Sequence, residues 1–187
     1  MHGLTPPSPW LLRWAHLLPA GGALLDVACG AGRHLHWAVQ QGLQATGIDR
    51  DAAALALAPA DARTVCADIE AGPWPLSGER FDAVLVFNYL WRPLWPALRE
   101  ALAPGGVLVY ETFADGQQTV GRPARPDFLL QPGELIERCA GLRIVAYEHG
   151  FLDAPARFVQ RIVAVRPAQA PDPASPARHA LAPPAGA

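Results

Sequence analysis

Short apolar runs alternate with amphipathic or Ala-rich stretches along most of this chain. The predicted strands are residues 23–28, 44–49, 63–68, 81–90 and 105–113. The predicted helices between them are residues 31–41, a short Ala-rich helix that stops at Pro59, and residues 92–102. Strands buried on both faces of a parallel sheet have nearly continuous apolar sequences, and helices make the crossovers between them. The pattern therefore predicts an α/β domain with a doubly wound parallel sheet.

The two ends of this pattern differ from its middle. Residues 8–19 begin with a serine cap and a proline, and apolar positions follow at helical spacing, which predicts a helix packed on the domain. After a predicted helix at 132–140, two strands at 142–151 and 157–166 follow without a helix between them. They are expected to pair as an antiparallel hairpin, which completes a seven-stranded, mostly parallel sheet.

The expected organisation is an N-terminal helix at 1–20, a catalytic or binding domain at 21–166, and a Pro/Ala-rich tail at 167–187. The tail is too poor in large apolar residues to form a core and is expected to be disordered. Residues 114–131 form a long stretch without clear periodicity. Loops of this length in compact domains are often functional, so a substrate loop is predicted there.

Composition narrows the function classes. The 187 residues carry a net charge of −2, and every basic residue other than histidine is arginine. The absence of lysine excludes Schiff-base and P-loop lysine chemistry, and the charge offers no basic face for nucleic acid. No apolar run approaches the ~18 residues of a membrane span. Three cysteines without a CxxC pair suggest reduced thiols and a cytoplasmic protein.

Polar residues and glycine follow the ends of successive predicted strands. They are Asp26, Gly30, Asp49, Asp68 and Asn88. Ligands of doubly wound sheets bind at the carboxyl ends of the strands, beside the point where the strand order reverses. Five groups from separate elements should therefore meet at one rim, which predicts a binding site.

The stretch LLDVACGAGRH decides between two adenosine-containing cofactors. Gly30 and Gly32 fit the first two positions of the dinucleotide fingerprint G-x-G-x-x-G, but Leu35 occupies the third. Asp26 would repel a pyrophosphate and would attract an amino group or a sulfonium. These residues favour a cationic cofactor over a nicotinamide dinucleotide. An NAD(P)-dependent oxidoreductase is thus the disfavoured alternative, and a non-catalytic binding protein stays open.

Five motifs then resemble, in order, those of the class I S-adenosylmethionine-dependent methyltransferases: LLDVACGAG, GIDRD, CADIE, FDAVLVFNYL and LAPGGVLVYETF. Within that superfamily the chain resembles the small bacterial members grouped with tellurite-resistance methyltransferases. The resemblance implies a Rossmann-like methyltransferase fold, S-adenosyl-L-methionine as cofactor, and methyl transfer as the activity.

The resemblance also implies which residues bind the cofactor. Asp26 would hold its amino group, Asp49 would accept from both ribose hydroxyls, and Asp68 would accept from the adenine amino group. Asp49 as a turn former and Asp68 as a turn cap remain alternatives. The implied cofactor contacts are Asp26, Ala28, Cys29, Gly30, Gly32, Asp49, Arg50, Asp68, Ile69 and Asn88.

Residues near the transferred methyl are candidates for catalysis and acceptor binding. The catalytic candidates are Asn88, Tyr89 and Glu111. As alternatives, Asn88 and Tyr89 could be core polar groups that bond to the backbone, and Glu111 could pair with a loop arginine. Arg122 and Trp91 are the candidates for substrate binding.

The acceptor is expected to be a small molecule and not a nucleic acid. No proline stands next to the motif asparagine in FNYLWRP, whereas the nucleic-acid amino methyltransferases of this fold carry an Asn/Asp-Pro-Pro-aromatic tetrad there. His34 and His36 are two positions apart on a helix and cannot share a metal. His34 is expected to be solvated, with contact to the cofactor carboxylate as the alternative. The acceptor atom and the oligomeric state stay open.

Overall fold

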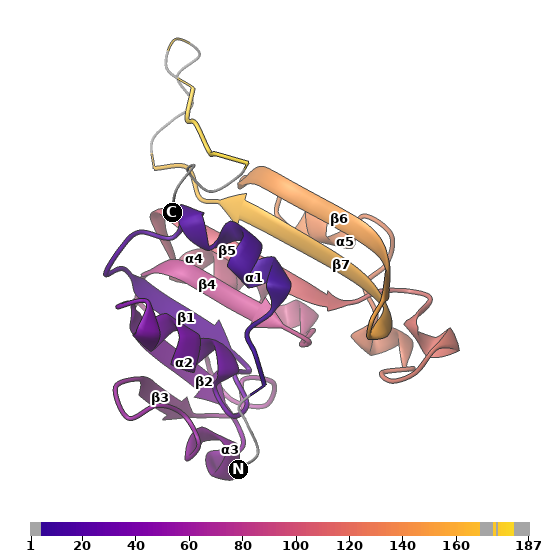
Figure 1. Cartoon of the computed structure of the whole chain (residues 1–187), viewed down its shortest axis with the longest axis horizontal. Helices are drawn as coiled ribbons and strands as arrows, with labels where there is room; N and C mark the ends of the chain where they lie inside the picture. The colour runs from indigo at the N-terminus through magenta and orange to yellow at the C-terminus, as the bar shows by residue number, and fades with distance from the viewer. Residues whose placement is uncertain (1–4, 169–173, 175, 182–187) are drawn as a thin grey trace.

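The computed structural model describes residues 5–168, 174 and 176–181. A single seven-stranded sheet runs through it in the order β3-β2-β1-β4-β5-β7-β6 (Figure 1). The first five strands pair in parallel, and β7 is antiparallel to both β5 and β6. The expected mixed sheet with its C-terminal hairpin is confirmed. The strands are β1 (Ala23–Val27), β2 (Gln44–Asp49), β3 (Arg63–Cys66), β4 (Phe81–Phe87), β5 (Leu102–Phe113), β6 (Arg143–Asp153) and β7 (Ala156–Val165).

Helices cover both faces of the sheet. In Figure 1, α1 and α2 lie in front of it, and α4 and α5 lie behind it. The α-helices are α1 (Pro9–Trp14), α2 (Arg33–Gln40), α3 (Ala52–Leu55), α4 (Trp95–Ala101) and α5 (Glu134–Arg138). The short 3-10 helices are η1 (Ala15–Leu17), η2 (Arg92–Leu94), η3 (Gln117–Thr119) and η4 (Pro126–Phe128).

The strands are apolar on both sides because each side has its own core. Along β4, Val84 and Val86 belong to the cluster that includes α4 and α5. Leu85 and Phe87 belong to the cluster that includes α1 and α2. Successive side chains of a strand point to opposite faces, so alternate residues serve alternate cores. This burial explains the continuous apolar runs from which the strands were predicted.

The N-terminal helix is shorter than residues 8–19. Ser8 caps α1 as expected, because its Oγ accepts the Trp10 N–H at 3.1 Å. The α-helix ends at Trp14 and continues only as η1. Leu18 is extended, with φ −82° and ψ 132°, since a residue that precedes proline is disfavoured from the helical region. Trp10 and Trp14 are buried against the sheet, so the helix packs on the domain.

The strand β5 begins earlier than expected and contains an irregular turn. Phe81 pairs with Leu102, but Ala83 pairs with Val107, so residues 103–106 bulge out of the ladder. Gly105 has φ +82°, which accommodates the turn that was predicted at this place.

Residues 114–131 contain η3 and η4, and backbone contacts join the two ends of this loop. Ala114 bridges Leu130, and the Leu130 N–H donates to the Phe113 carbonyl at 3.0 Å.

In the tail, residues 169–173, 175 and 182–187 lie outside the described residues, so its expected disorder stays a prediction. Within the described tail, the Ala180 carbonyl lies 3.0 Å from His16 Nε2. No helix in the described part of the chain is long and apolar enough to cross a membrane.

Candidate functional site

Two residues in the left-handed region mark the centre of the sheet's carboxyl edge. Ala28 follows β1 with φ +53°, and Asn88 follows β4 with φ +55°. They are the only non-glycine residues of the described chain with positive φ. The strands β1 and β4 are neighbours, and the chain order reverses between them. Such conformations cost about 1–3 kcal/mol each and concentrate at ligand sites. The backbone strain at Ala28 and Asn88 therefore lies at the edge of the sheet where doubly wound proteins bind their ligands.

The loop between β1 and α2 is shaped by glycine and by one carboxylate. Gly30 and Gly32 have φ +54° and +76°. A Cβ on Gly30 would meet nothing within 4 Å, so this backbone borders open space. The Gly30 N–H donates to Asp49 Oδ2 at 2.7 Å, and the Asp51 N–H donates to Asp49 Oδ1 at 2.9 Å. Asp49 thus fixes the glycine loop from the end of β2.

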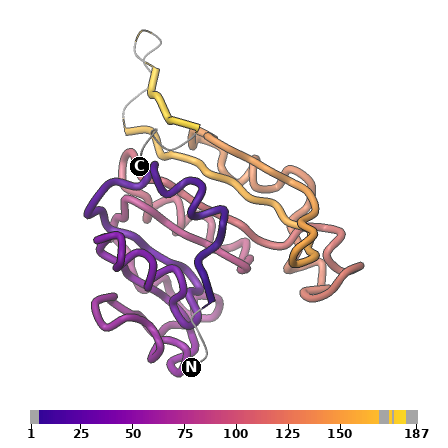
Figure 2. The backbone as a smooth tube through the Cα atoms, viewed as in Figure 1, coloured from indigo at the N-terminus to yellow at the C-terminus, as the bar shows by residue number. Residues whose placement is uncertain are grey.

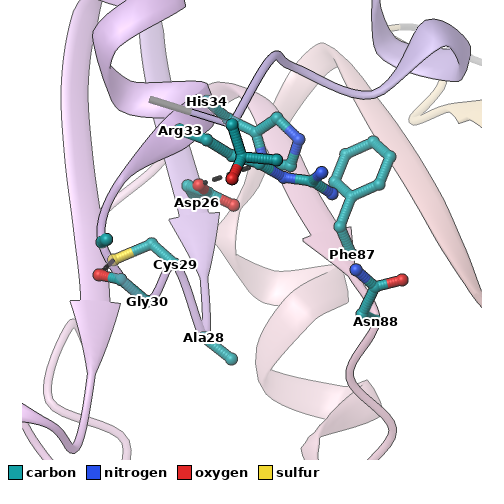
Figure 3. A pocket seen from close by; sticks show the side chains of 10 residues that line it. Asp26, Ala28, Cys29, Gly30, Arg33, His34, Phe87 and Asn88 are labelled. Atoms are coloured by element: carbon teal, nitrogen blue, oxygen red, sulfur yellow. Dashed lines mark hydrogen bonds and ion pairs between the residues drawn. The ribbon is translucent and has the colours of Figure 1, made fainter. Parts of the chain in front are cut away.

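A cavity of about 400 Å³ opens at the switch point between β1 and β4. Figure 3 shows Asp26, Arg33, His34 and Phe87 around it, with Asn88 at one side. Its size is within the range typical of small-molecule sites. The lining residues are Thr5, Asp26, Ala28, Cys29, Gly30, Ala31, Arg33, His34, Phe87 and Asn88.

Asp26 and His34 form a buried pair in the wall of this cavity. Their exposed fractions are 1% and 2%, and His34 Nδ1 lies 3.3 Å from Asp26 Oδ2. Asp26 Oδ2 still has no hydrogen bond of good geometry. The expectation that His34 is solvated is wrong, because α2 packs on the sheet and holds the His34 ring against Phe87, with ring centroids 4.3 Å apart and ring planes tilted by 44°. A buried carboxylate oxygen without a hydrogen bond favours a ligand with a donor.

Arg33 contributes the positive charge of the same cavity. Burial lowers the pKa of its guanidinium, and the carboxylates of Asp26 and Glu111 oppose that shift. It makes no hydrogen bond or ion pair with any described residue, and its side chain extends toward Phe87 in Figure 3. A half-buried cation without a partner favours an anionic ligand group.

A smaller cavity of about 220 Å³ lies on the other side of Ala28, at the ends of β2 and β3. Asp68 is exposed there, and its Oδ1 accepts the N–H groups of Glu70 and Ala71 at 2.9 and 3.2 Å. These two bonds lower the Asp68 pKa, so the turn-capping alternative describes part of its role. The lining residues are Ala28, Asp49, Arg50, Ala67, Asp68, Ile69, Glu70 and Tyr89.

Tyr89 faces the smaller cavity and not the larger one. Its hydroxyl is buried without a hydrogen-bond partner of good geometry. Burial raises its pKa well above 10, and the nearby carboxylates of Glu70 and Asp68 add to the rise. Its phenolate is therefore inaccessible near neutral pH. This placement favours a ligand contact over proton abstraction as the role of Tyr89.

Four other predicted site residues line neither cavity: Gly32, Glu111, Arg122 and Trp91. Glu111 is 1% exposed and pairs with Arg157 at 3.1 Å and Arg161 at 3.5 Å, both on β7. The alternative that it forms a salt bridge therefore applies, although its partners are strand residues and not loop arginines. Arg122 is exposed in the long loop, and Trp91 packs against the core cluster behind the sheet. Their roles in substrate binding stay predictions.

Cys29 lines the larger cavity as an unreactive thiol. Burial raises its pKa, and the carboxylates of Asp26 and Asp49 raise it further, so the thiol stays protonated. Across the described residues, no group of three or more His, Cys, Asp or Glu side chains could hold a metal ion.

Sequence reasoning missed several lining residues. Thr5, Arg33, Phe87 and Glu70 were not among the predicted site residues, although Phe87 and Glu70 lie within quoted motifs and Arg33 directly follows one. Arg33 directly follows the glycine loop, and this position was the signal that could have identified it.

Several proteins with a related sequence or fold are named as methyltransferases or carboxymethyltransferases. The family model for a methyltransferase domain matches residues 24–106. The tRNA U34 carboxymethyltransferase of Klebsiella pneumoniae is 29% identical over 175 residues, covering 82% of this chain and 52% of that protein. The enzyme of the same name from Cronobacter sakazakii is 30% identical, over 82% of this chain and 54% of its own length. The chain therefore spans about half the length of these relatives.

Solved structures share the fold at lower identity. An S-adenosylmethionine-dependent methyltransferase from Mesorhizobium loti aligns with a TM-score of 0.68 and 20% identity, over 88% of this chain and 100% of that chain. TehB from Haemophilus influenzae aligns with a TM-score of 0.63 and 19% identity, over 79% of this chain and 58% of that one. At these identities the likeness concerns the fold.

Proposed function

We propose that this chain is a class I S-adenosylmethionine-dependent methyltransferase and transfers the methyl group of its cofactor to a small polar acceptor. The observation that carries the proposal is a pair of cavities that adjoin at Ala28, each lined by a carboxylate at the end of its own strand, Asp26 in one and Asp49 in the other. Such an arrangement suits an elongated ligand with a cationic end and a nucleoside end.

The larger cavity fits the methionine part of S-adenosylmethionine. The Asp26 carboxylate would accept from the α-amino group, and Arg33 would pair with the α-carboxylate. Opposite charges that line one cavity match a zwitterion. The open space at Gly30 leaves room for close approach of the ligand.

The smaller cavity fits the adenosine part. Asp49 would accept from the ribose hydroxyls, as charge-assisted hydrogen bonds worth about 1.5–3 kcal/mol. Ile69 would pack on the adenine ring, and Asp68 and Tyr89 would contact its polar edge. In this role Asp49 serves twice, because it also fixes the Gly30 N–H.

The bound cofactor supplies an activated methyl group on a sulfonium. The chain's contribution is alignment, which can supply about 7–11 kcal/mol when reacting groups are held in place. Asn88 lies at the larger cavity, and its exposed side chain can bind a polar acceptor. Its backbone is held because its N–H donates to the Glu111 carbonyl at 2.9 Å. Glu111 therefore acts in this proposal as a support and not as a base.

A small acceptor agrees with the net charge of −2 and with the cavity of about 400 Å³. RNA is the second candidate, because the relatives at 29–30% identity are named for a tRNA position and for carboxymethyl transfer. A protein that binds nucleic acid usually presents a basic face, and this chain lacks the overall charge for one.

The unpaired cysteines agree with a cytoplasmic setting, which is part of the proposal.

Cofactor choice is tested by thermal unfolding with S-adenosylmethionine, S-adenosylhomocysteine or NADH. A ligand at a hundred times its dissociation constant stabilises the folded state by about 2.7 kcal/mol. For a domain of this size, we expect the two sulfur nucleosides to raise the Tm by about 5–10 °C. A shift with NADH alone would overturn the proposal in favour of an oxidoreductase.

The acceptor class is tested by following methyl transfer from labelled S-adenosylmethionine. One set of reactions contains small oxygen, nitrogen, sulfur and metalloid acceptors, and the other contains unmodified bulk tRNA. We expect label in the small-molecule fraction. Label in tRNA alone would establish the RNA candidate instead.

Arg33 provides a further test of the ligand's orientation. We expect Arg33→Met to weaken S-adenosylhomocysteine binding by about tenfold, since a charge-assisted pair is lost. An analogue without the carboxylate should bind the variant and the native chain equally. Calorimetric titrations give all four affinities. An equal loss for both ligands would contradict the carboxylate assignment.

A further inference from the structure

The buried carboxylate of the cavity is connected to the N-terminal segment through one histidine. His34 Nδ1 faces Asp26 Oδ2 at 3.3 Å, and His34 Nε2 accepts the Ser8 N–H at 3.3 Å. All three residues are at most 2% exposed. A series of buried contacts therefore links Asp26 on β1, through His34 on α2, to Ser8, which caps α1.

The Ser8 amide fixes the tautomer of His34. A backbone N–H can only donate, so Nε2 must carry a lone pair and the ring proton of a neutral imidazole must be on Nδ1. That proton faces the carboxylate of Asp26. The orientation of the Asp26 carboxylate and the position of the Ser8 backbone thus depend on the same ring.

Residues 5–8 form part of the cavity wall. Thr5 lines the larger cavity, and Ser8 Oγ lies 3.5 Å from Glu111 Oε1 while it accepts the Trp10 N–H. Figure 2 shows this indigo segment running from α1 past the carboxyl edge of the central strands, toward the end marked N. Pro6 and Pro7 restrict its backbone. A shift of this segment would change the cavity itself.

We propose that His34 is a positioning residue that orients Asp26 toward the cofactor's amino group and couples cofactor binding to the closure of residues 5–8. The inference rests on the proposed function, because Asp26 is assigned there to the cofactor. Coupling between two sites is reciprocal. A closed segment strengthens cofactor binding, and a bound cofactor stabilises the closed segment by the same factor.

Ser8 allows the coupling to be isolated with a matched pair of variants. Its φ of −59° lies in the range that proline requires, so Ser8→Pro removes the N–H without imposing a new φ. Ser8→Ala keeps the N–H, and both variants lose the side-chain cap of α1. The difference between them therefore reports the contact with His34.

The first readout is S-adenosylhomocysteine affinity by calorimetry on the full chain. We expect Ser8→Pro to bind about fivefold more weakly than Ser8→Ala, the effect of one ordinary hydrogen bond. In a His34→Asn background, the acceptor for the Ser8 N–H is gone while a donor remains for Asp26. There, the two Ser8 variants should bind equally. Equal binding in the native background would overturn the inference.

The second readout is hydrogen exchange at the start of α1. S-adenosylhomocysteine should slow exchange of the Trp10 amide about fivefold in the native chain and leave it unchanged in the His34→Asn variant. Unchanged exchange in the native chain with tight ligand binding would overturn the coupling alone. A native chain that fails to bind S-adenosylhomocysteine would overturn the proposed function and this inference with it.

Discussion

Replacing Glu111 with glutamine should lower the free energy of unfolding by about 3–5 kcal/mol. Glu111 is 1% exposed, and its partners Arg157 and Arg161 are less than one-fifth exposed. Glutamine keeps the shape but removes the charge, so the largely buried Arg157 guanidinium loses its counterion and Arg161 keeps only Glu148. Such a loss corresponds to a fall in Tm of about 6–20 °C, which calorimetry or circular dichroism would measure.

Glu148 provides the control for this prediction. It pairs with Arg13 and Arg161 at the outer end of the same network and is 40% exposed. Since exposed pairs contribute little, Glu148→Gln should cost less than about 1 kcal/mol. S-adenosylhomocysteine affinity should be retained in both variants below their Tm. Unchanged stability of Glu111→Gln with complete loss of methyl transfer would contradict the structural role and restore Glu111 as a catalytic residue.

Asp49→Ala should weaken S-adenosylhomocysteine binding by about 10- to 150-fold, which corresponds to 1.5–3 kcal/mol for hydrogen bonds to a charged group. The variant loses the proposed ribose contacts and also releases the Gly30 N–H from Asp49 Oδ2. The glycine loop would then lose its fixed position beside both cavities. Isothermal titration measures the affinity directly.

Asp51 is the matched control for Asp49, two residues farther along. Its Oδ1 caps α3 by accepting the N–H groups of Ala53 and Ala54, and it lines neither cavity. Asp51→Ala should cost about 1 kcal/mol of stability through the lost cap and leave the affinity unchanged. Equal affinity losses in the two variants would remove Asp49 from the site.

The sheet could be predicted from sequence because each strand's environment is recorded in its own residues. The strand β4 is apolar at every position from Ala83 to Phe87, since both faces are covered. Asp26, Asp49 and Asn88 were found for a related reason. Each lies at or directly after a strand end, and the carboxyl ends of parallel strands meet at one edge.

Contacts between distant segments could not be predicted in this way. The antiparallel register of β5 and β7 places Glu111 opposite Arg161, and its other partner, Arg157, lies 46 positions from Glu111 in the sequence. His34 sits in a helix whose sequence gives no indication that its ring is buried against Phe87 and Ser8. Polar side chains in a core depend on partners from other elements, which local periodicity does not record.

The left-handed residues Ala28 and Asn88 have a consequence for engineering a more heat-resistant form of this protein. Glycine at either position would relieve side-chain crowding in the folded chain, yet it would also increase the freedom of the unfolded chain. A stability screen that selected glycine at these positions would yield variants in which the two turns that border the larger cavity are looser. Such gains in heat resistance are commonly made at the expense of activity, so both positions should be held constant in that screen.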